Sequence, residues 1–364
     1  MINILTKKTE FNYSLHGLRG LASLLVYIAH SCDGFREHMC NKGIIEPILL
    51  HLYYLGSFGV EIFFFLSGYV IFSASLKADL KNFAAHRIWR IYPVFIFFTV
   101  LYFVLNHFIQ REPWKDSFSI LITNGFFLNL FLNTPALSPN AWTITYEVWF
   151  YIMTFALLRP IVLKKMYIIS FIALILWGYF IWKHPISLYY VMGMLTNIFL
   201  RKECILSHKQ NSNIINTIQY ISLFITIFLA AASDYRYHWE YMNNARLWIL
   251  LIAFNIFMVT LFHQPSTFTR FLSRKSLLFF GTISYSLYLT HPYSYLIARM
   301  TAQNFMAHGV YFEMASLIYI MLNLALTVVF VFFIFKFIEN KMYKFGTGKT
   351  IYTPVSSPVT VPQR

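Results

Sequence analysis

Long apolar stretches alternate with short polar segments along almost the whole chain. Most of these stretches are long enough to cross the hydrocarbon core of a bilayer as a helix, which takes about 20 residues. We expect eleven of them, at 15–32, 52–75, 90–109, 118–133, 143–160, 166–182, 186–200, 213–232, 246–263, 277–298 and 313–338. The pattern predicts an all-α, polytopic transmembrane helical bundle over residues 15–340. We expect a cytoplasmic segment at 1–14 before it and a disordered cytoplasmic tail at 341–364 after it.

The fourth stretch, 118–133, differs from the others because it is short and interrupted by polar residues. It carries Asn124, Gly125, Asn129 and Asn133. Backbone of this kind is tolerated at membrane depth only where protein or water surrounds it. We therefore expect 118–133 to be a re-entrant segment, which returns to the side from which it came.

The distribution of basic residues supports this topology. With a cytoplasmic N-terminus and a re-entrant 118–133, 21 Lys and Arg residues lie on the cytoplasmic side and 8 lie outside. If 118–133 spans the membrane instead, the 14 cytoplasmic basic residues after it move outside and the bias disappears. The positive-inside rule therefore favours about ten full spans and one re-entrant segment, with both termini cytoplasmic.

Composition places the whole chain in the membrane. Of its 364 residues 58% are hydrophobic and only 12% are charged, with a mean hydropathy of +0.57, whereas soluble domains average about 25% charged residues. The net charge of +15 comes from basic residues between the apolar stretches, without clustered stacking aromatics. This distribution is typical of membrane topology signals and argues against a nucleic-acid partner.

The three cysteines do not indicate a metal site or a disulfide scaffold, because they show no ligand spacing. Cys32 and Cys40 share the first outside loop of the predicted topology, and Cys204 faces the cytoplasm. A Cys32–Cys40 disulfide and a pair of unpaired thiols both remain open.

The first apolar stretch carries two polar residues that fall on one helical face. Arg19 and His30 are eleven residues apart, which is within about 20° of three full turns and about 16 Å along a helix axis. Charged or polar groups at such depth need an internal polar track, and a neutral imidazole suits a general base. The alternatives are a positive-inside anchor for Arg19 and a headgroup or carbonyl contact for His30.

A second polar cluster lies at the start of the third stretch. Arg87 and Arg90 lie three residues apart at the start of the third stretch, so they share a helical face and could bind phosphate with bidentate guanidinium donors. Topogenic charge is the alternative interpretation of both arginines.

Acidic residues also fall inside apolar stretches, where a carboxylate is costly unless it is paired or faces water. Glu147 lies within the aromatic segment NAWTITYEVWFY, and Glu61 lies within the second stretch. The neighbouring Trp142 and Tyr146 could instead belong to the aromatic belt at the membrane surface.

These motifs, in this order, resemble the acyltransferase-3 family of membrane acyltransferases, which includes O-antigen and other surface-polysaccharide O-acetyltransferases. The resemblance covers about residues 12–340. It rests on the Arg-x10-His pair, GVEIFFFLSGYVIF, RxxRIYP, WTITYEVWFY and ISYSLYLTHP at 283–292.

The resemblance implies transfer of an acyl group, usually acetyl, from cytoplasmic acyl-CoA to a sugar hydroxyl on or beyond the outer face of the bacterial inner membrane. Acyl-CoA is then a donor substrate and no cofactor is permanently bound. His30 would be the catalytic base, Arg19 its essential partner and Glu147 the acidic partner. Arg87 and Arg90 would bind the CoA side, and we assign Trp142, Tyr146 and Glu61 to substrate binding.

The resemblance leaves the acceptor and the partners open. Some relatives finish the transfer with a C-terminal esterase-like domain of the SGNH type. Without one, this chain is expected to hand over the acyl group within its membrane domain or to a separate esterase-like partner, and a homo-oligomer is a further option. A diffusible small molecule is an alternative acceptor. A saccharide or acyl transporter is an alternative function, although the chain shows no two-half repeat of the kind many transporters carry.

Overall fold

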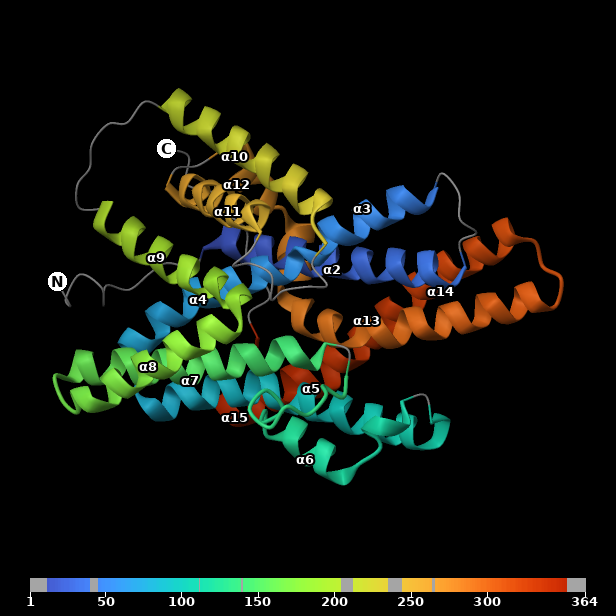
Figure 1. The fold of residues 1–364 in the computed structure, drawn as a ribbon, viewed down its shortest axis with the longest axis horizontal. Helices are drawn as coiled ribbons and strands as arrows, with labels where there is room; N and C mark the ends of the chain where they lie inside the picture. Colours follow the sequence, from blue (N-terminus) through green and yellow to red (C-terminus); the bar gives the residue numbers. More distant parts are fainter. Residues whose placement is uncertain are drawn as a thin grey trace.

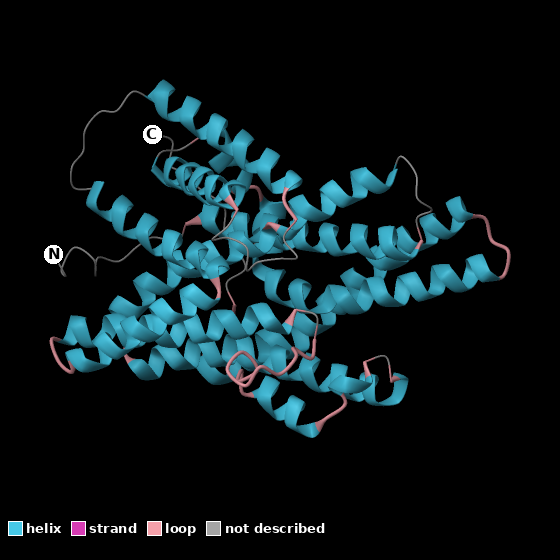
Figure 2. Cartoon of the chain, viewed as in Figure 1, coloured by secondary structure: helices cyan, strands magenta, loops and turns pink. Residues whose placement is uncertain are grey.

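The computed structural model describes residues 12–39, 45–110, 112–138, 140–203, 212–234, 244–263 and 266–351. These residues form helices and connecting loops without a strand (Figure 2). Six helical stretches among them are long and apolar enough to cross a membrane, judged by length and composition. The all-α fold and a multi-pass membrane protein are thereby confirmed. The ten spans, the re-entrant segment and the cytoplasmic termini stay predictions.

The helices follow the predicted apolar stretches closely. They are α2 (Tyr13–His38), α3 (Ile45–Ser57), α4 (Gly59–Lys77), α5 (Leu80–Ile109), α6 (Phe118–Gly125), α7 (Ala141–Leu163), α8 (Tyr167–Lys183), α9 (Leu188–Glu203), α10 (Ser212–Ala232), α11 (Ala245–His263), α12 (Thr267–Leu272), α13 (Lys275–Ala307), α14 (Phe312–Phe333) and α15 (Asn340–Thr347). A π-helical segment, Ile334–Glu339, joins α14 to α15.

The helices form a bundle in which some of the helices that pack together are far apart in the sequence. Helix α13 packs along both α2 and α14, while α4 packs along α9 and α7 (Figure 1). Helices α10 and α11 pack together, as do α7 and α8. The N-terminal helix α2 is therefore held mainly by α13, which lies about 260 residues later in the chain.

Glycines allow close backbone contact in two helix pairs, α4–α9 and α2–α13. A Cβ atom added to Gly68 of α4 would lie 2.1 Å from the carbonyl oxygen of Tyr190, and one added to Gly193 of α9 would lie 2.0 Å from that of Phe65. Helices in membranes associate through close packing of small residues, because lipid provides little hydrophobic drive. Gly68, which has no side chain, thus permits the close approach of α4 to α9.

The α2–α13 pair has the same character. A Cβ atom at Gly20 would lie 2.2 Å from the carbonyl oxygen of Leu277, and one at Gly281 would lie 2.2 Å from that of His16. These contacts lie on either side of Arg19 and determine how α2 presents it.

Two predicted boundaries need correction. The stretch 52–75 is not one helix but two, since α3 ends at Ser57 and α4 begins at Gly59. The break lies between Gly56 and Gly59, whose Cβ positions are taken by the backbone of α2. In the predicted tail, residues 341–347 continue as α15, where Tyr343 contacts His86 and Phe345 contacts Trp89 of α5. Residues 352–364 lie outside the described part.

The polar fourth stretch forms a short helix followed by turns. Helix α6 ends at Gly125, and Asn124 holds the loop after it: its side-chain amide donates to the carbonyl oxygens of Ile120 and Pro135, and its Oδ1 accepts from the backbone of Leu137. Asn124 therefore satisfies backbone groups of the irregular segment, as such a segment requires.

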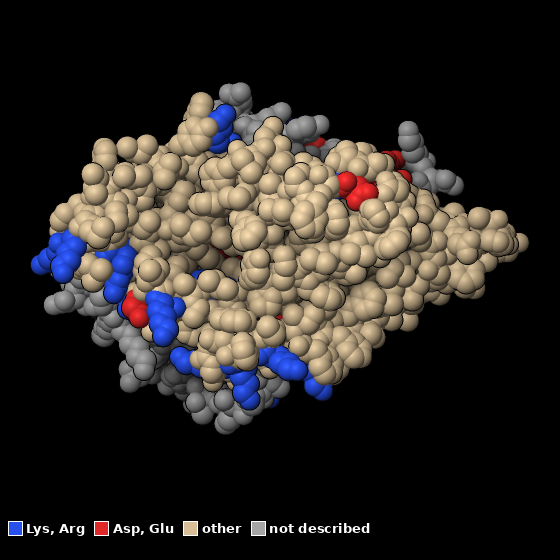
Figure 3. Space-filling view, turned by 90° about the horizontal axis from the view of Figure 1, so that it is seen from below, with Lys and Arg blue, Asp and Glu red and all other residues tan. Residues whose placement is uncertain are grey.

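The choice between a Cys32–Cys40 disulfide and two unpaired thiols falls on Cys40, which lies outside the described residues. Lys and Arg side chains gather over the left half of the face in Figure 3. The α7–α8 connection, with Lys164 and Lys165, lies at this end in Figure 1. The side of the membrane on which this basic end lies stays a prediction.

We predict that Gly193→Leu disrupts the α4–α9 contact, because backbone atoms already occupy the space a side chain needs. Overpacking typically costs about 1–3 kcal/mol, so the thermal unfolding temperature in detergent should fall and less folded protein should be recovered. Gly178→Leu on α8 is the matched control, since nothing lies within 4 Å of its Cβ position. Equal stability of both variants would contradict the close contact.

Candidate active site

A cavity of about 620 Å³ lies between helices α2, α4, α5, α7, α9 and α13. This size falls within the usual range of about 300–1,000 Å³ for ligand pockets. Its charged lining residues are Arg19, Arg87 and Glu147. The cavity extends to Asn12 before α2 and to Ser73 near the end of α4. It therefore reaches the end of the bundle that the sequence places on the cytoplasmic side.

Glu147 is held in this cavity by hydroxyl groups. The Ser67 hydroxyl donates a hydrogen bond of 2.7 Å to Oε1 of Glu147, and the Tyr151 hydroxyl donates to the same oxygen. The guanidinium of Arg87 lies over the Tyr151 ring, 5.1 Å from its centroid. The carboxylate thus has the stabilising partners that a charge among apolar helices requires.

Arg19 projects from α2 into the same cavity. It interacts electrostatically with Arg90, which repels it, and with Glu147 and Glu339, which attract it. It forms no ion pair within 4.0 Å among the described residues. Arg19 and Arg87 therefore place two cations beside one carboxylate, and the arrangement favours an anionic or strongly polar ligand.

Arg90 has a different environment from Arg87. Its Nη1 lies 2.9 Å from Oε1 of Glu339, whose side chain is fully buried, and Arg90 itself is 15% exposed. The Ser286 hydroxyl donates to the other carboxylate oxygen. Glu339 ends the π-helical segment, a distortion that is often found at functional sites. Arg90 does not line the cavity.

His30 lies beyond the other end of the cavity. Its ring stacks on that of His291 from α13, with centroids 5.2 Å apart and planes 24° apart, and Tyr53 meets it edge-on. His30 thus packs within the protein but does not line the cavity, whose wall on that side includes Tyr288.

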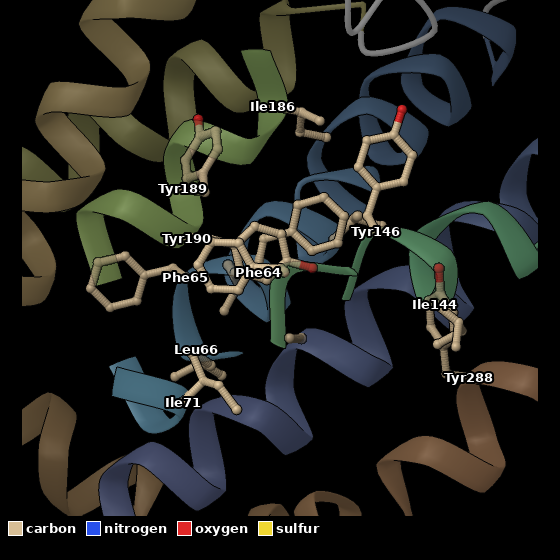
Figure 4. Close-up of a cluster of buried hydrophobic side chains, with 14 of the residues drawn as sticks. Phe64, Phe65, Leu66, Ile71, Ile144, Tyr146, Ile186, Tyr189, Tyr190 and Tyr288 are labelled. Carbon is tan, nitrogen blue, oxygen red and sulfur yellow. The ribbon is translucent and has the colours of Figure 1, made fainter. Parts of the chain in front are cut away.

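The other predicted substrate residues also lie outside the cavity. Trp142 packs edge-on against Phe64, and the Tyr146 hydroxyl lies 2.8 Å from Nδ1 of His184. Figure 4 shows Tyr146 at the edge of the aromatic cluster in which Phe64 and Tyr190 stack at 4.5 Å. Glu61 is fully buried and interacts electrostatically with Tyr288. Their roles in substrate binding stay predictions.

The structure adds residues that the sequence did not single out for chemistry. Tyr151 lies one helical turn after Glu147, so their spacing could have indicated the contact. Glu339 directly follows the last apolar stretch, and His291 closes the ISYSLYLTH segment. Ser67 carried no comparable signal, because its partner is 80 residues away in the chain.

We predict that Glu339→Gln destabilises the protein strongly, because it leaves the Arg90 charge buried without compensation. Breaking a buried ion pair from one side typically costs about 3–5 kcal/mol. The double variant Arg90→Met, Glu339→Leu should recover most of this loss, as measured by thermal unfolding in detergent. A double variant less stable than the single one would argue against an isolated ion pair.

Three relatives share limited sequence identity with this chain. ORF330 of Acidianus two-tailed virus, provisionally named an acetyltransferase, is 23% identical over 79% of this chain and 84% of its own length. O-acetyltransferase OatA of Staphylococcus aureus is 26% identical over 78% of this chain and 52% of its own length. Peptidoglycan O-acetyltransferase OatA of Listeria monocytogenes is 26% identical over 72% and 48%, respectively. This chain thus spans about half the length of the OatA proteins.

No solved structure matches this fold at a significant level. The sequence model of the acyltransferase-3 family, which describes an acyltransferase domain, matches residues 12–337. The matched region contains every helix that lines the cavity. The chain therefore belongs to the acyltransferase-3 family.

Proposed function

We propose that this protein is a membrane O-acyltransferase of the bacterial inner membrane. It moves an acyl group, acetyl in the first instance, from cytoplasmic acyl-CoA to a hydroxyl of a cell-surface or lipid-linked glycan. The observation that carries this proposal is the cavity in which Arg19 and Arg87 face the Glu147 cluster. The relatives named O-acetyltransferase and peptidoglycan O-acetyltransferase support the reaction and the class of acceptor.

The donor fits the charge and the position of the cavity. Two guanidiniums offer directional donors to phosphate groups, and Arg87 lies close to the predicted cytoplasmic end of α5. Arg90 lies near the same end of α5 and pairs with Glu339. This ion pair links α5 to the segment after α14. We therefore assign phosphate binding to Arg87 and Arg19 and a positioning role to Arg90.

The chemistry requires a base for the acceptor hydroxyl and stabilisation of the developing oxyanion. In the proposed reaction His30 removes the hydroxyl proton, the alkoxide oxygen attacks the thioester carbonyl, and the C–S bond breaks. The CoA thiolate then takes up the proton. His30 lies about 16 Å along α2 from Arg19, so the phosphates and the reacting thioester occupy different depths of the bundle.

We predict that Arg87→Ala raises the KM for acetyl-CoA about tenfold to a hundredfold, because a charged hydrogen bond contributes about 1.5–3 kcal/mol. Steady-state transfer of labelled acetyl groups in isolated membranes measures this change. Lys81→Ala, an exposed position on the same helix, is the matched control and should leave the KM unchanged. A change in acceptor KM alone would place Arg87 outside the donor site.

We further predict that Arg19→Ala and His30→Ala lower acetyl-CoA-dependent O-acetylation by at least about a hundredfold, to a small residual rate, in protein that remains folded and inserted. Labelled product should accumulate on isolated envelope glycan of cells expressing the wild-type chain. Labelled ester in the culture medium would indicate a diffusible acceptor instead. Saccharide binding without any turnover of acetyl-CoA would indicate a transporter and refute the enzyme.

A further inference from the structure

His291 is a buried imidazole that the chemistry above does not use. It lies on α13, where its side chain is 1% exposed, and its ring stacks on that of His30. Tyr27 and Tyr288 meet the same ring edge-on. The two histidines therefore form a stacked pair bordered by aromatic side chains, in which His291 is buried and His30 is half-buried.

The hydrogen bonding of His291 determines its tautomer. Its Nδ1 lies 3.0 Å from the backbone carbonyl oxygen of Leu287. A carbonyl oxygen only accepts hydrogen bonds, so Nδ1 carries the hydrogen and Nε2 of the neutral ring presents its lone pair. A base that removes a hydroxyl proton needs a ring nitrogen with a free lone pair, and this tautomer provides one at Nε2.

The Nε2 atom of His291 is buried and has no hydrogen-bond partner within the described part of the chain. A buried acceptor left unsatisfied costs about 1–3 kcal/mol. Such groups are uncommon and are often explained by a catalytic role or by a ligand. The lone pair of His291 is thus without a protein partner among the described residues.

Tyr288 connects this pair to the cavity. Tyr288 lines the cavity, and its ring centroid lies 6.0 Å from that of His291. The Tyr288 hydroxyl hydrogen-bonds the Thr143 hydroxyl at 2.7 Å, and Asn140 donates to the Tyr288 carbonyl oxygen. Both anchors come from the segment at the start of α7. The histidine pair therefore lies next to the donor cavity, with Tyr288 in contact with both.

We propose, resting on the function proposed above, that His291 and His30 act as one proton-transfer unit for the acceptor hydroxyl. Nε2 of His291 accepts the hydrogen bond of that hydroxyl. Its proton passes to the imidazole pair as the oxygen forms the ester bond and the thioester C–S bond breaks. The pair then returns the proton to the CoA thiolate. Two stacked imidazoles hold one proton rather than two, because adjacent like charges repel.

The test uses His291→Asn in the full-length protein in membranes. The Asn amide can still donate to the Leu287 carbonyl, but it offers no basic nitrogen. General base catalysis contributes about 10²–10⁴-fold, so kcat for acetyl transfer should fall by at least about a hundredfold. The KM for acetyl-CoA should stay within about twofold, because His291 does not line the cavity.

His308→Asn is the matched control. This histidine ends the same helix and makes the same contact one turn back, from Nδ1 to the carbonyl oxygen of Asn304 at 2.8 Å, but it is exposed. Its replacement should leave both kinetic constants unchanged.

The double variant His30→Ala, His291→Asn separates a shared role from two independent ones. Groups that act as a unit show strongly non-additive effects, so the double variant should be no slower than the slower single variant within about threefold. Multiplied losses would overturn the proposal. Should His291→Asn fold poorly, His291→Gln gives the same comparison, with rates referred to the folded fraction.

The outcome also distinguishes this inference from the proposed function. Wild-type protein that neither binds nor turns over acetyl-CoA overturns both. Active wild-type protein together with a His291→Asn variant of near-normal kcat overturns the role of His291 alone and leaves the acyltransferase function standing.

Discussion

Carboxylates inside an apolar helical bundle must be compensated by donors, and here those donors come largely from other helices. Glu339 pairs with Arg90 of α5 and accepts a hydrogen bond from Ser286 of α13. Glu147 of α7 accepts from Ser67 of α4. Because uncompensated burial of a charge is costly, these contacts select the relative placement of α4, α5, α7, α13 and the end of α14. The polar cavity forms where these helices meet.

This compensation depends on how closely the helices approach. Gly68 and Gly193 bring the backbones of α4 and α9 together, and Gly20 and Gly281 do the same for α2 and α13. Lipid does not drive apolar helices together as water does, so small residues and interhelical hydrogen bonds provide the association. The same contacts present Arg19 to the cavity and His30 to His291. Stability and site geometry therefore share one set of residues.

The interior divides into two polar regions with different chemistry. The cavity holds fixed charges, Arg19, Arg87 and Glu147, and reaches the more basic end of the bundle. The histidine pair contains titratable neutral rings and lies behind Tyr288. On the function proposed above, a donor with phosphate groups would bind in the first region and a hydroxyl acceptor beside the second. The ring of Tyr288 then stands where the two substrates would have to meet.

The apolar stretches alone predicted the helical fold and the positions of the long helices, because lipid requires long hydrogen-bonded apolar segments. They did not predict the break between α3 and α4 or the short helices α12 and α15. The cost of charge in such segments also identified Arg19 and Glu147, and the three-residue spacing between Arg87 and Arg90 identified Arg87; all three line the cavity. The sequence did not separate Arg87 from Arg90, since only the packing of α5 against the end of α14 gives Arg90 a carboxylate partner. Nor did it pair His30 with His291 or Ser67 with Glu147, because residues distant in the chain become neighbours only through tertiary packing. Helix formation is a local property of the chain, whereas a polar site in a membrane bundle forms only when the helices pack against one another.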